Sequence, residues 1–227
     1  AFQKTVDYCH EKDLVVIGDV KRGDIGSTSE AYAVAHLGKV QIGSKSYATF
    51  NEDFATVNPY LGTDGIKPFT DVCKEQGKGI FALVRTSNPS AGDLQDLELK
   101  DGRHVYDAMA DMVNEWGKDL VGESGFSSVG AVVGATWPEQ AVELRKRMPN
   151  NLILVPGYGA QGAGADAAVA SFTKDGKGSI VNASRSLMCA WKKRTDLEPH
   201  EFQKATRDEA IDMRNKLNAA LKDRKYV

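Results

Sequence analysis

The segment IGDVKRGDIGST (residues 17–28) places Asp19, Lys21 and Asp24 within six positions, directly after an apolar run. Residues two apart on a strand project from the same face, so we expect Asp19 and Lys21 to point the same way, with Cα atoms roughly 7 Å apart. Two carboxylates around one ammonium favour the charged lysine and hold it in place. A lysine held in this way can stabilise a carbanion that forms beside it and then protonate that carbon.

The same spacing also fits an ion pair at the exposed rim of a sheet, which would contribute about 0 to 1 kcal/mol. On spacing alone this structural interpretation is the better one, because charged residues make up 26% of the chain. The residues at the ends of the other apolar runs favour the catalytic interpretation of this lysine.

Two neighbouring segments carry groups that bind anions: PGYGAQG (156–162) and NASRS (182–186). Their glycine-rich turns free backbone N–H groups, the start of the following helix adds its dipole, and Gln161 and Arg185 supply side-chain donors. An isolated glycine run of this kind would more safely be read as a tight turn. Adjacent glycine-rich and arginine-bearing ends on the last two strands of a barrel, however, form its usual phosphate site. We therefore favour a phosphate site.

Neutral polar residues follow a third apolar run, in RTSNPSAGDLQDL (85–97). Ser87 and Asn88 offer donors and acceptors of the kind that read the edge of a heterocycle or an amide. They fit a turn fixed by Pro89 equally well. The histidines fall in helical segments or at helix starts, and we expect all four at the surface: His10, His36, His104 and His200.

Six short apolar runs must position these groups: 14–20, 54–62, 80–88, 129–136, 152–159 and 179–186. Nearly continuous apolar runs are typical of strands that are covered on both faces, which indicates a parallel sheet. Helical segments alternate with the runs. We predict two capping boxes, Ser27 with Glu30 in a helix that Gly38 ends, and Thr136 with Glu139 in a helix with Pro138 in its first turn.

This alternation suits an open doubly wound sheet or a (β/α) barrel, both of the α/β class. Polar residues at the end of every run favour the barrel, because all of its strands end at one mouth. A (β/α)8 TIM-type barrel has eight strands, and six are evident. We find no linker and no repeat, so we expect residues 1–227 to form a single barrel domain that lacks the first two βα units.

Composition indicates which kinds of partner the protein binds and in which cellular compartment it lies. The 29 basic and 31 acidic residues are spread along the chain, so we expect no nucleic-acid partner. No apolar run approaches the ~18 to 20 residues of a membrane span. Cys9, Cys73 and Cys189 lie far apart and in no CxxC spacing, which argues for a reducing compartment and against a zinc site. The first residues do not read as a signal peptide, and we expect a cytoplasmic protein.

The segments DVKRGDIGST, TVNPYLG, LVRTSNPSAGDLQDL, VVGAT, VPGYGAQGAGAD and NASRS are similar to the orotidine 5′-phosphate decarboxylase family, in its bacterial subgroup with longer loops. The resemblance extends over essentially the whole chain. It implies a carboxy-lyase that uses no cofactor and no metal. The implied reaction converts orotidine 5′-monophosphate to uridine 5′-monophosphate and carbon dioxide, in de novo pyrimidine biosynthesis.

The resemblance also implies roles for individual residues. Lys21 matches the lysine that protonates ring carbon 6 as carbon dioxide leaves, and Asp19 matches the carboxylate beside the substrate's own carboxylate. Asp24, Ile25 and Thr28 match a segment that is lent to the neighbouring subunit, which implies a homodimer with shared active sites. The other matches bind substrate: Ser87 the pyrimidine ring, Pro156 and Gln161 in the loop over the substrate, and Arg185 with the backbone of Ser184 the phosphate.

Two other functions remain open from the sequence. Magnesium-dependent sugar-phosphate decarboxylases and aldolases of the same superfamily also carry DxKxxD, but they need further carboxylates at strand ends. TVNPYLG, VVGAT and NASRS contain no acidic residue. The third possibility is a non-catalytic binder of nucleotide phosphates. The family's first two strands carry an aspartate and a second lysine of the charged array, and we match neither to this sequence.

Overall fold

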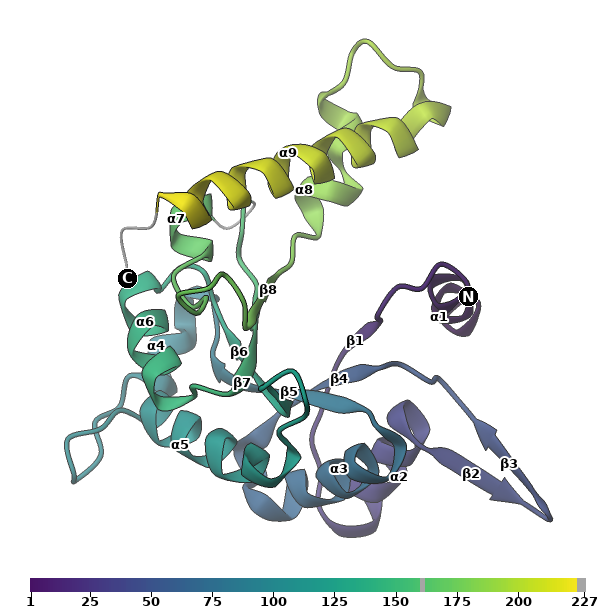
Figure 1. Ribbon diagram of the computed structural model, residues 1–227, viewed down its shortest axis with the longest axis vertical. Coiled ribbons are helices and arrows are strands. Elements are labelled where there is room, and N and C mark those ends of the chain that lie inside the picture. The colour runs from purple at the N-terminus through teal and green to yellow at the C-terminus, as the bar shows by residue number, and fades with distance from the viewer. Residues whose placement is uncertain (160–161, 224–227) are drawn as a thin grey trace. The chain divides into compact units, whose positions relative to one another are not determined.

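Strands and helices alternate along residues 1–159 and 162–223, the part of the chain that the computed structural model describes (Figure 1). Six strands follow the order β1-β4-β5-β6-β7-β8, and the registers of β1 with β4, β4 with β5 and β7 with β8 are parallel. Their bounds are β1 Ile17–Arg22, β4 Phe54–Val57, β5 Gly79–Arg85, β6 Ser127–Val133, β7 Asn151–Val155 and β8 Ser179–Val181. The predicted parallel α/β sheet is confirmed.

The chain divides into two compact units. Unit 1 comprises residues 1–84, 108–131 and 150–152, and unit 2 comprises residues 85–107, 132–149 and 153–227. The helices of unit 1 are α1 Phe2–His10, α2 Gly26–Leu37 and α3 Thr63–Gln76, joined by most of α5 Val105–Gly117. Those of unit 2 are α4 Gly92–Gln95, α6 Pro138–Arg147, α7 Ala165–Ala168, α8 Arg185–Met188 and α9 Phe202–Lys222.

In unit 1, helices α2 and α3 lie side by side (Figure 1). Ile66 and Phe69 of α3 are buried, as are Ile80 and Phe81 of β5. Burial of such side chains supplies about 1.5 to 3 kcal/mol each, which is the main source of stability for these elements. Helix α3 ends where Gly77 adopts a left-handed conformation with φ 65°, a backbone state that glycine adopts without strain.

The start of β1 is fixed by the carboxylate of Asp53, which directly precedes β4. It accepts hydrogen bonds from the backbone N of Val16 at 2.8 Å, from Lys78 Nζ at 3.0 Å and from His10 Nε2 at 3.0 Å. Burial raises the pKa of Asp53, but these hydrogen bonds outweigh it and leave the pKa below its usual value. Helix α1, strand β1 and the residue before β5 are therefore joined at one charged group.

In unit 2, the charged side chain of Arg145 joins α6 to neighbouring segments through hydrogen bonds, as Asp53 joins elements in unit 1. Its guanidinium donates to the carbonyls of Ser171 and Gly178, each at 2.7 Å, and of Met148 at 2.8 Å. Burial lowers the pKa of Arg145 to about 10, so the group remains charged at neutral pH. It ties the end of α6 to the residue before β8.

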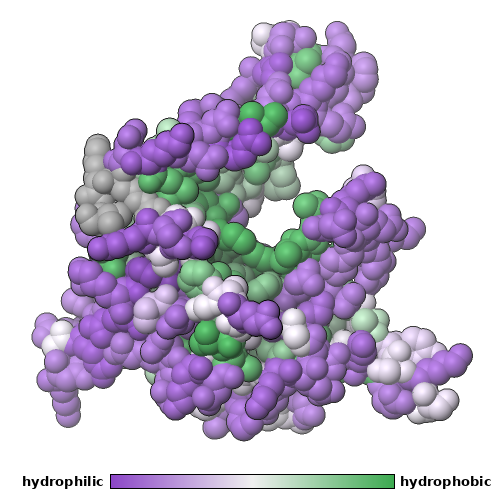
Figure 2. All heavy atoms as spheres, in the orientation of Figure 1, coloured by the Kyte–Doolittle hydropathy of each residue, from purple (hydrophilic) through white to green (hydrophobic). Residues whose placement is uncertain are grey.

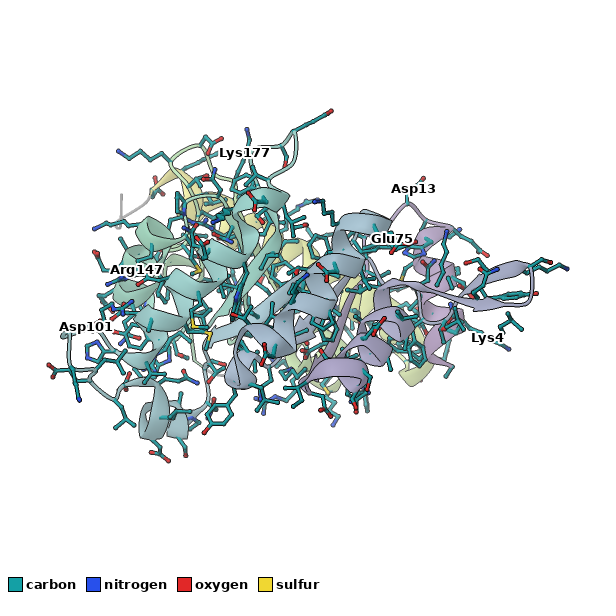
Figure 3. The ribbon with its side chains drawn as sticks, turned by 90° about the horizontal axis from the view of Figure 1, so that it is seen from below. Lys4, Asp13, Glu75, Asp101, Arg147 and Lys177 are labelled. Atoms are coloured by element: carbon teal, nitrogen blue, oxygen red, sulfur yellow. The ribbon has the colours of Figure 1, made fainter. Side chains whose placement is uncertain are left out.

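Helix α9 packs on α7 and α8 through a single stripe (Figure 1). Its buried residues, Ala205, Met213 and Ala220, recur at close to whole helical turns, as on an amphipathic helix that covers a core with one face. Its surface visible in Figure 2 is mostly hydrophilic. Charged side chains elsewhere, such as Lys4 and Glu75 of unit 1, likewise project outward from the ribbon (Figure 3). No helix within the described ranges is both long and apolar enough to cross a membrane.

Both predicted capping boxes are wrong. Helix α2 begins at Gly26, with Ile25 as its N-cap, so Ser27 lies inside the helix. Helix α6 has Trp137 as its N-cap, and neither cap makes a side-chain hydrogen bond. The predicted end of α2 at Gly38 and the place of Pro138 in the first turn of α6 are confirmed.

An antiparallel hairpin that was not predicted from the sequence, β2 Lys39–Ile42 with β3 Lys45–Ala48, extends from unit 1 (Figure 1). Val40 lies opposite Tyr47, so these two side chains share a face, and both are exposed. The surface position expected for His36 is also wrong, since its side chain is buried.

Candidate active site

The ammonium group of Lys21 forms an ion pair with Asp19 Oδ1 at the carboxyl end of β1. Both side chains stay about half exposed or more, at 52% for Lys21 and 64% for Asp19, so the pair is open to a ligand. The predicted association of the two residues is therefore present in this chain. Their local geometry, however, differs from that of a regular strand.

A bulge separates the two residues from the regular ladder. Gly18 pairs with Ala55 and Arg22 with Val57, so four steps along β1 match two along β4. Lys21 has a φ of 45°, in the left-handed region that non-glycine residues seldom adopt. Such a conformation costs on the order of 1 to 3 kcal/mol and persists only where its surroundings enforce it. Strand alternation is thus not what brings Asp19 and Lys21 together.

The hydroxyl of Thr56 on β4 holds both members of the pair. Thr56 Oγ1 accepts a hydrogen bond from the backbone N of Lys21 at 2.9 Å and donates to Asp19 Oδ1 at 3.1 Å. Thr56 is 1% exposed, so this is a buried support beneath an exposed ion pair. Thr56 is not among the site residues predicted from the sequence. The available signal was a lone hydroxyl within the apolar strand FATV.

The next predicted residues lie at the start of α2. The Asp24 carboxylate accepts a hydrogen bond from the backbone N of Ile25 at 2.8 Å. Of the two carboxylates expected around Lys21, Asp19 forms the ion pair and, among the described contacts, Asp24 does not. Ile25 is 53% exposed, and Thr28 is exposed in the first turn of α2. The side chains of Ile25 and Thr28 are therefore exposed to solvent in the segment that follows Asp19 and Lys21 in the chain.

In unit 2, backbone hydrogen bonds link the strand ends in series. Gly134 N donates to Arg85 O at 2.7 Å, Ala135 N to Pro156 O at 2.8 Å, and Asn182 N to Val155 O at 3.2 Å. The segments that carry the predicted residues Ser87, Pro156, Ser184 and Arg185 are thereby joined. Gln161, the remaining predicted site residue, lies outside the described residues.

Ser87 and Arg185 are placed by different local features. A side chain on Gly134 would put its Cβ 2.8 Å from Ser87 Cβ, so this glycine lets the loop after β5 approach the end of β6. Ser184 is the N-cap of α8, and Arg185 is its first residue and is exposed. Because α8 is a single turn, its dipole is small, and the charge of Arg185 is the main attraction for an anion.

A fully buried arginine supports the loop that carries Ser87. The guanidinium of Arg85 lies 4.1 Å from the ring centroid of Trp137, and its Nε donates to Gln140 Oε1 at 2.7 Å. It also forms an ion pair with Asp96 at 3.0 Å. Trp137 Nε1 in turn donates to the carbonyl of Thr86 at 3.0 Å. Arg85 was not predicted from the sequence, because a charged residue at the end of a strand is usually exposed.

Among the residues described, no group of three or more His, Cys, Asp or Glu side chains is arranged to hold a metal ion. In unit 1 the functional groups are the ammonium of Lys21 and the carboxylate of Asp19, and the ammonium can deliver a proton. In unit 2 the exposed guanidinium of Arg185 can hold an anion.

The parallel sheet, with its polar groups at the carboxyl ends of strands, is of the kind that (β/α)-barrel proteins have. Solved structures share this fold. One is the orotidine monophosphate decarboxylase of Leishmania donovani, with a TM-score of 0.68 and 32% identity, covering 92% of this chain and 69% of that one. Another is the enzyme of Methanocaldococcus jannaschii, with a TM-score of 0.64 and 21% identity, covering 94% and 80%. Six of the βα units of such a barrel are evident among the described residues.

The chain belongs to the orotidine 5′-phosphate decarboxylase / HUMPS family, whose model matches residues 2–198. Its curated relatives include the orotidine 5′-phosphate decarboxylase of Clostridium tetani, 43% identical over 221 residues, which cover 97% of this chain and 73% of the relative. The protein of the same name from Rhodopirellula baltica is 43% identical over 217 residues, with 94% and 70% covered.

Proposed function

We propose that this protein is a carboxy-lyase that converts orotidine 5′-monophosphate to uridine 5′-monophosphate and carbon dioxide, in de novo pyrimidine biosynthesis. The observation that carries the proposal is the Lys21–Asp19 ion pair, held by Thr56 at the end of β1 in a chain of this family.

In the proposed step, the bond between ring carbon 6 and the substrate's carboxylate breaks, and its electron pair stays on carbon 6. The Lys21 ammonium stabilises this developing negative charge, which is an interaction gained in the transition state. Lys21 then donates a proton to carbon 6, and water reprotonates the amine. The step needs no cofactor, because the electron pair of the broken bond is taken up by that proton.

Asp19 serves in this scheme to hold the ammonium in place beside the leaving carboxylate. Repulsion between the two carboxylates is a contested source of rate, and we assign none to it. Through its two hydrogen bonds, Thr56 fixes the carboxylate of Asp19 relative to the backbone of Lys21.

We assign the residues of unit 2 to substrate binding. Arg185 and the backbone of Ser184 would hold the phosphate, Ser87 would bind the pyrimidine ring, and Pro156 and Gln161 would also contribute to substrate binding. Binding energy from the phosphate, which does not react, can orient the ring and drive loop closure. The exposure of Arg185 and the hydrogen-bonded series of strand ends support this assignment.

We further propose a cytoplasmic homodimer with shared active sites and with neither nucleic acid nor membrane as a partner. Large apolar side chains are exposed around Asp24: Ile25 follows it in the chain, and Leu61, 50% exposed, lies like the Asp24 carbonyl against Gly65. Tyr60, the residue before Leu61, is 73% exposed. A partner subunit that covered them would gain hydrophobic stabilisation and would receive Asp24 in its own site. We also propose that residues 1–227 belong to a single barrel domain.

The test is to follow the loss of orotate absorbance and the release of carbon dioxide with and without a chelator. We expect the same turnover in both. Turnover that is lost with the chelator and restored by Mg²⁺ would contradict the proposal, in favour of a magnesium-dependent enzyme. Tight binding of a uridine monophosphate analogue without any turnover would identify a non-catalytic binder instead.

A further inference from the structure

A buried pair of side chains in unit 1 lies beside the segment that carries Lys21. His36 Nδ1 on α2 lies 2.9 Å from Glu52 Oε1, and their side chains are 4% and 0% exposed. The His36 ring also stacks on Phe50, with centroids 5.0 Å apart. Polar groups are costly to bury, and among the described residues Glu52 Oε2 has no hydrogen-bond partner. Helix packing alone does not account for this carboxylate.

The proton on His36 can be located from its second neighbour. Arg22 Nε lies 3.4 Å from His36 Nε2. A guanidinium can only donate hydrogen bonds, so Nε2 must accept this one, and the ring proton then lies on Nδ1. From there it is donated to the Glu52 carboxylate. A chain of hydrogen bonds thus runs from the positive charge of Arg22 to the negative charge of Glu52.

The same pair touches both ends of the bulge in β1. Gly18 and Arg22 are the residues in register with β4 on either side of Asp19 and Lys21. A Cβ on Gly18 would lie 2.5 Å from Glu52 Oε1, so Glu52 packs directly against the Gly18 backbone. Arg22, at the other end, bonds to His36. The strained backbone of Lys21 therefore lies between two residues that a single buried pair holds.

We propose that His36 and Glu52 are positioning residues for Lys21: they act through Gly18 and Arg22 to hold the bulge that aims the ammonium group. This inference rests on the proposed function of Lys21. A pair with only a structural role would contribute to the stability of unit 1 and leave turnover by the folded protein unchanged.

Three variants separate these roles. His36→Phe keeps a ring to stack on Phe50 but removes both nitrogens, and Glu52→Gln keeps an acceptor for His36 but removes the charge. Arg22→Lys changes an exposed residue, keeps its charge and removes the Nε donor, so it carries little risk of unfolding. A misplacement of about 1 Å can cost about 100-fold in rate, so we expect kcat to fall about 10- to 100-fold in the first two and less in the third. KM should stay within about threefold.

Leu144→Ala is the matched control for stability, because it opens a cavity in the core of unit 2. It should lower the Tm and leave kcat unchanged well below that temperature. If all three variants kept wild-type kcat and lost only Tm, the positioning role would be overturned.

A second readout does not depend on turnover. The rate of reductive methylation at Lys21, measured by peptide mass spectrometry, should rise severalfold in His36→Phe and Glu52→Gln, while that at Lys67, which pairs with Asp71, stays constant. An unchanged rate at Lys21 would count against the inference. Lys21→Ala is assayed alongside: if it kept normal turnover, the proposed function would fail, and the methylation rates would still decide whether the pair positions Lys21.

Discussion

Lys21 is held from two directions, through its ammonium by Asp19 and through its backbone N by Thr56. The ion pair is largely exposed and contributes little to stability, about 0 to 1 kcal/mol. The contact to the buried hydroxyl is shielded from water and is the stronger constraint on where the lysine lies. We therefore expect that removing the Thr56 hydroxyl lowers turnover, although Thr56 itself does not take part in the chemical step.

Thr56→Val tests this support, because valine keeps the shape of threonine and removes the hydroxyl. Loss of the hydrogen bonds to Asp19 and Lys21 should lower kcat about 10-fold and stability by about 1 to 3 kcal/mol. Thr56→Ser, which retains the hydroxyl, should stay close to the wild type in steady-state assays and urea titrations. Equal losses in the two variants would mean that the hydroxyl is not the cause.

The sequence predicted the partnership of Asp19 and Lys21, because both residues lie in one short segment. It could not predict the bulge, since the positive φ falls on a lysine and no glycine marks the position. Nor could it predict Thr56 or the pair of His36 and Glu52. These contacts join residues 16 to 37 positions apart, and only the fold brings them together.

At the scale of elements, strand β1 depends on the charge that anchors its start. The pKa of Asp53 is below its usual value, so the folded state gains stability from the ionised group above the unfolded pKa of about 3.8. That stability is lost as the pH falls below about 4 and the carboxylate takes up a proton.

Asp53→Asn should therefore lower stability at pH 7 by about 1 to 3 kcal/mol. It should also flatten the part of the acid-unfolding curve that lies below about pH 4. Urea titrations at pH 7, 5 and 3.5 measure both effects. A variant that tracks the wild type in parallel down to pH 3.5 would show that Asp53 does not carry this dependence.

Arg85 provides a second test at this scale, because it supports the loop that carries Ser87. Arg85→Met keeps a long apolar stem against Trp137 but loses the donors to Gln140 and Asp96. We expect KM for the substrate to rise about 10-fold, with a smaller change in kcat, since the ring site is displaced and the charged pair of β1 is not. A change confined to kcat would contradict this role.

The order of strands and helices could be predicted from the sequence because each strand is a continuous apolar run and each long helix is amphipathic. Element boundaries were less predictable. Ser27 and Thr136 suggested helix caps, yet the N-caps of α2 and α6 are Ile25 and Trp137. The hairpin was missed because its strands have four residues each and lie outside the hydrophobic core.

At the scale of the whole molecule, the proposed homodimer predicts complementation between inactive variants. If Asp24 acts in the partner subunit's site, a hybrid of Lys21→Ala and Asp24→Asn subunits contains one doubly defective site and one intact site. Mixing the two variants in equal amounts should then restore about a quarter of wild-type activity. Activity that stays at the sum of the two variants, while sedimentation shows exchange of subunits, would contradict shared sites.

In the proposed reaction, the ammonium of Lys21 stabilises the negative charge that develops on the pyrimidine ring. The most direct measurement is the turnover of orotidine 5′-monophosphate by Lys21→Ala, with circular dichroism to verify the fold. Removal of one neutral oxyanion donor costs about 100- to 1,000-fold, so loss of a charged donor that also delivers the proton should lower kcat on the order of 1,000-fold or more. A folded Lys21→Ala protein with near-normal turnover would contradict the account.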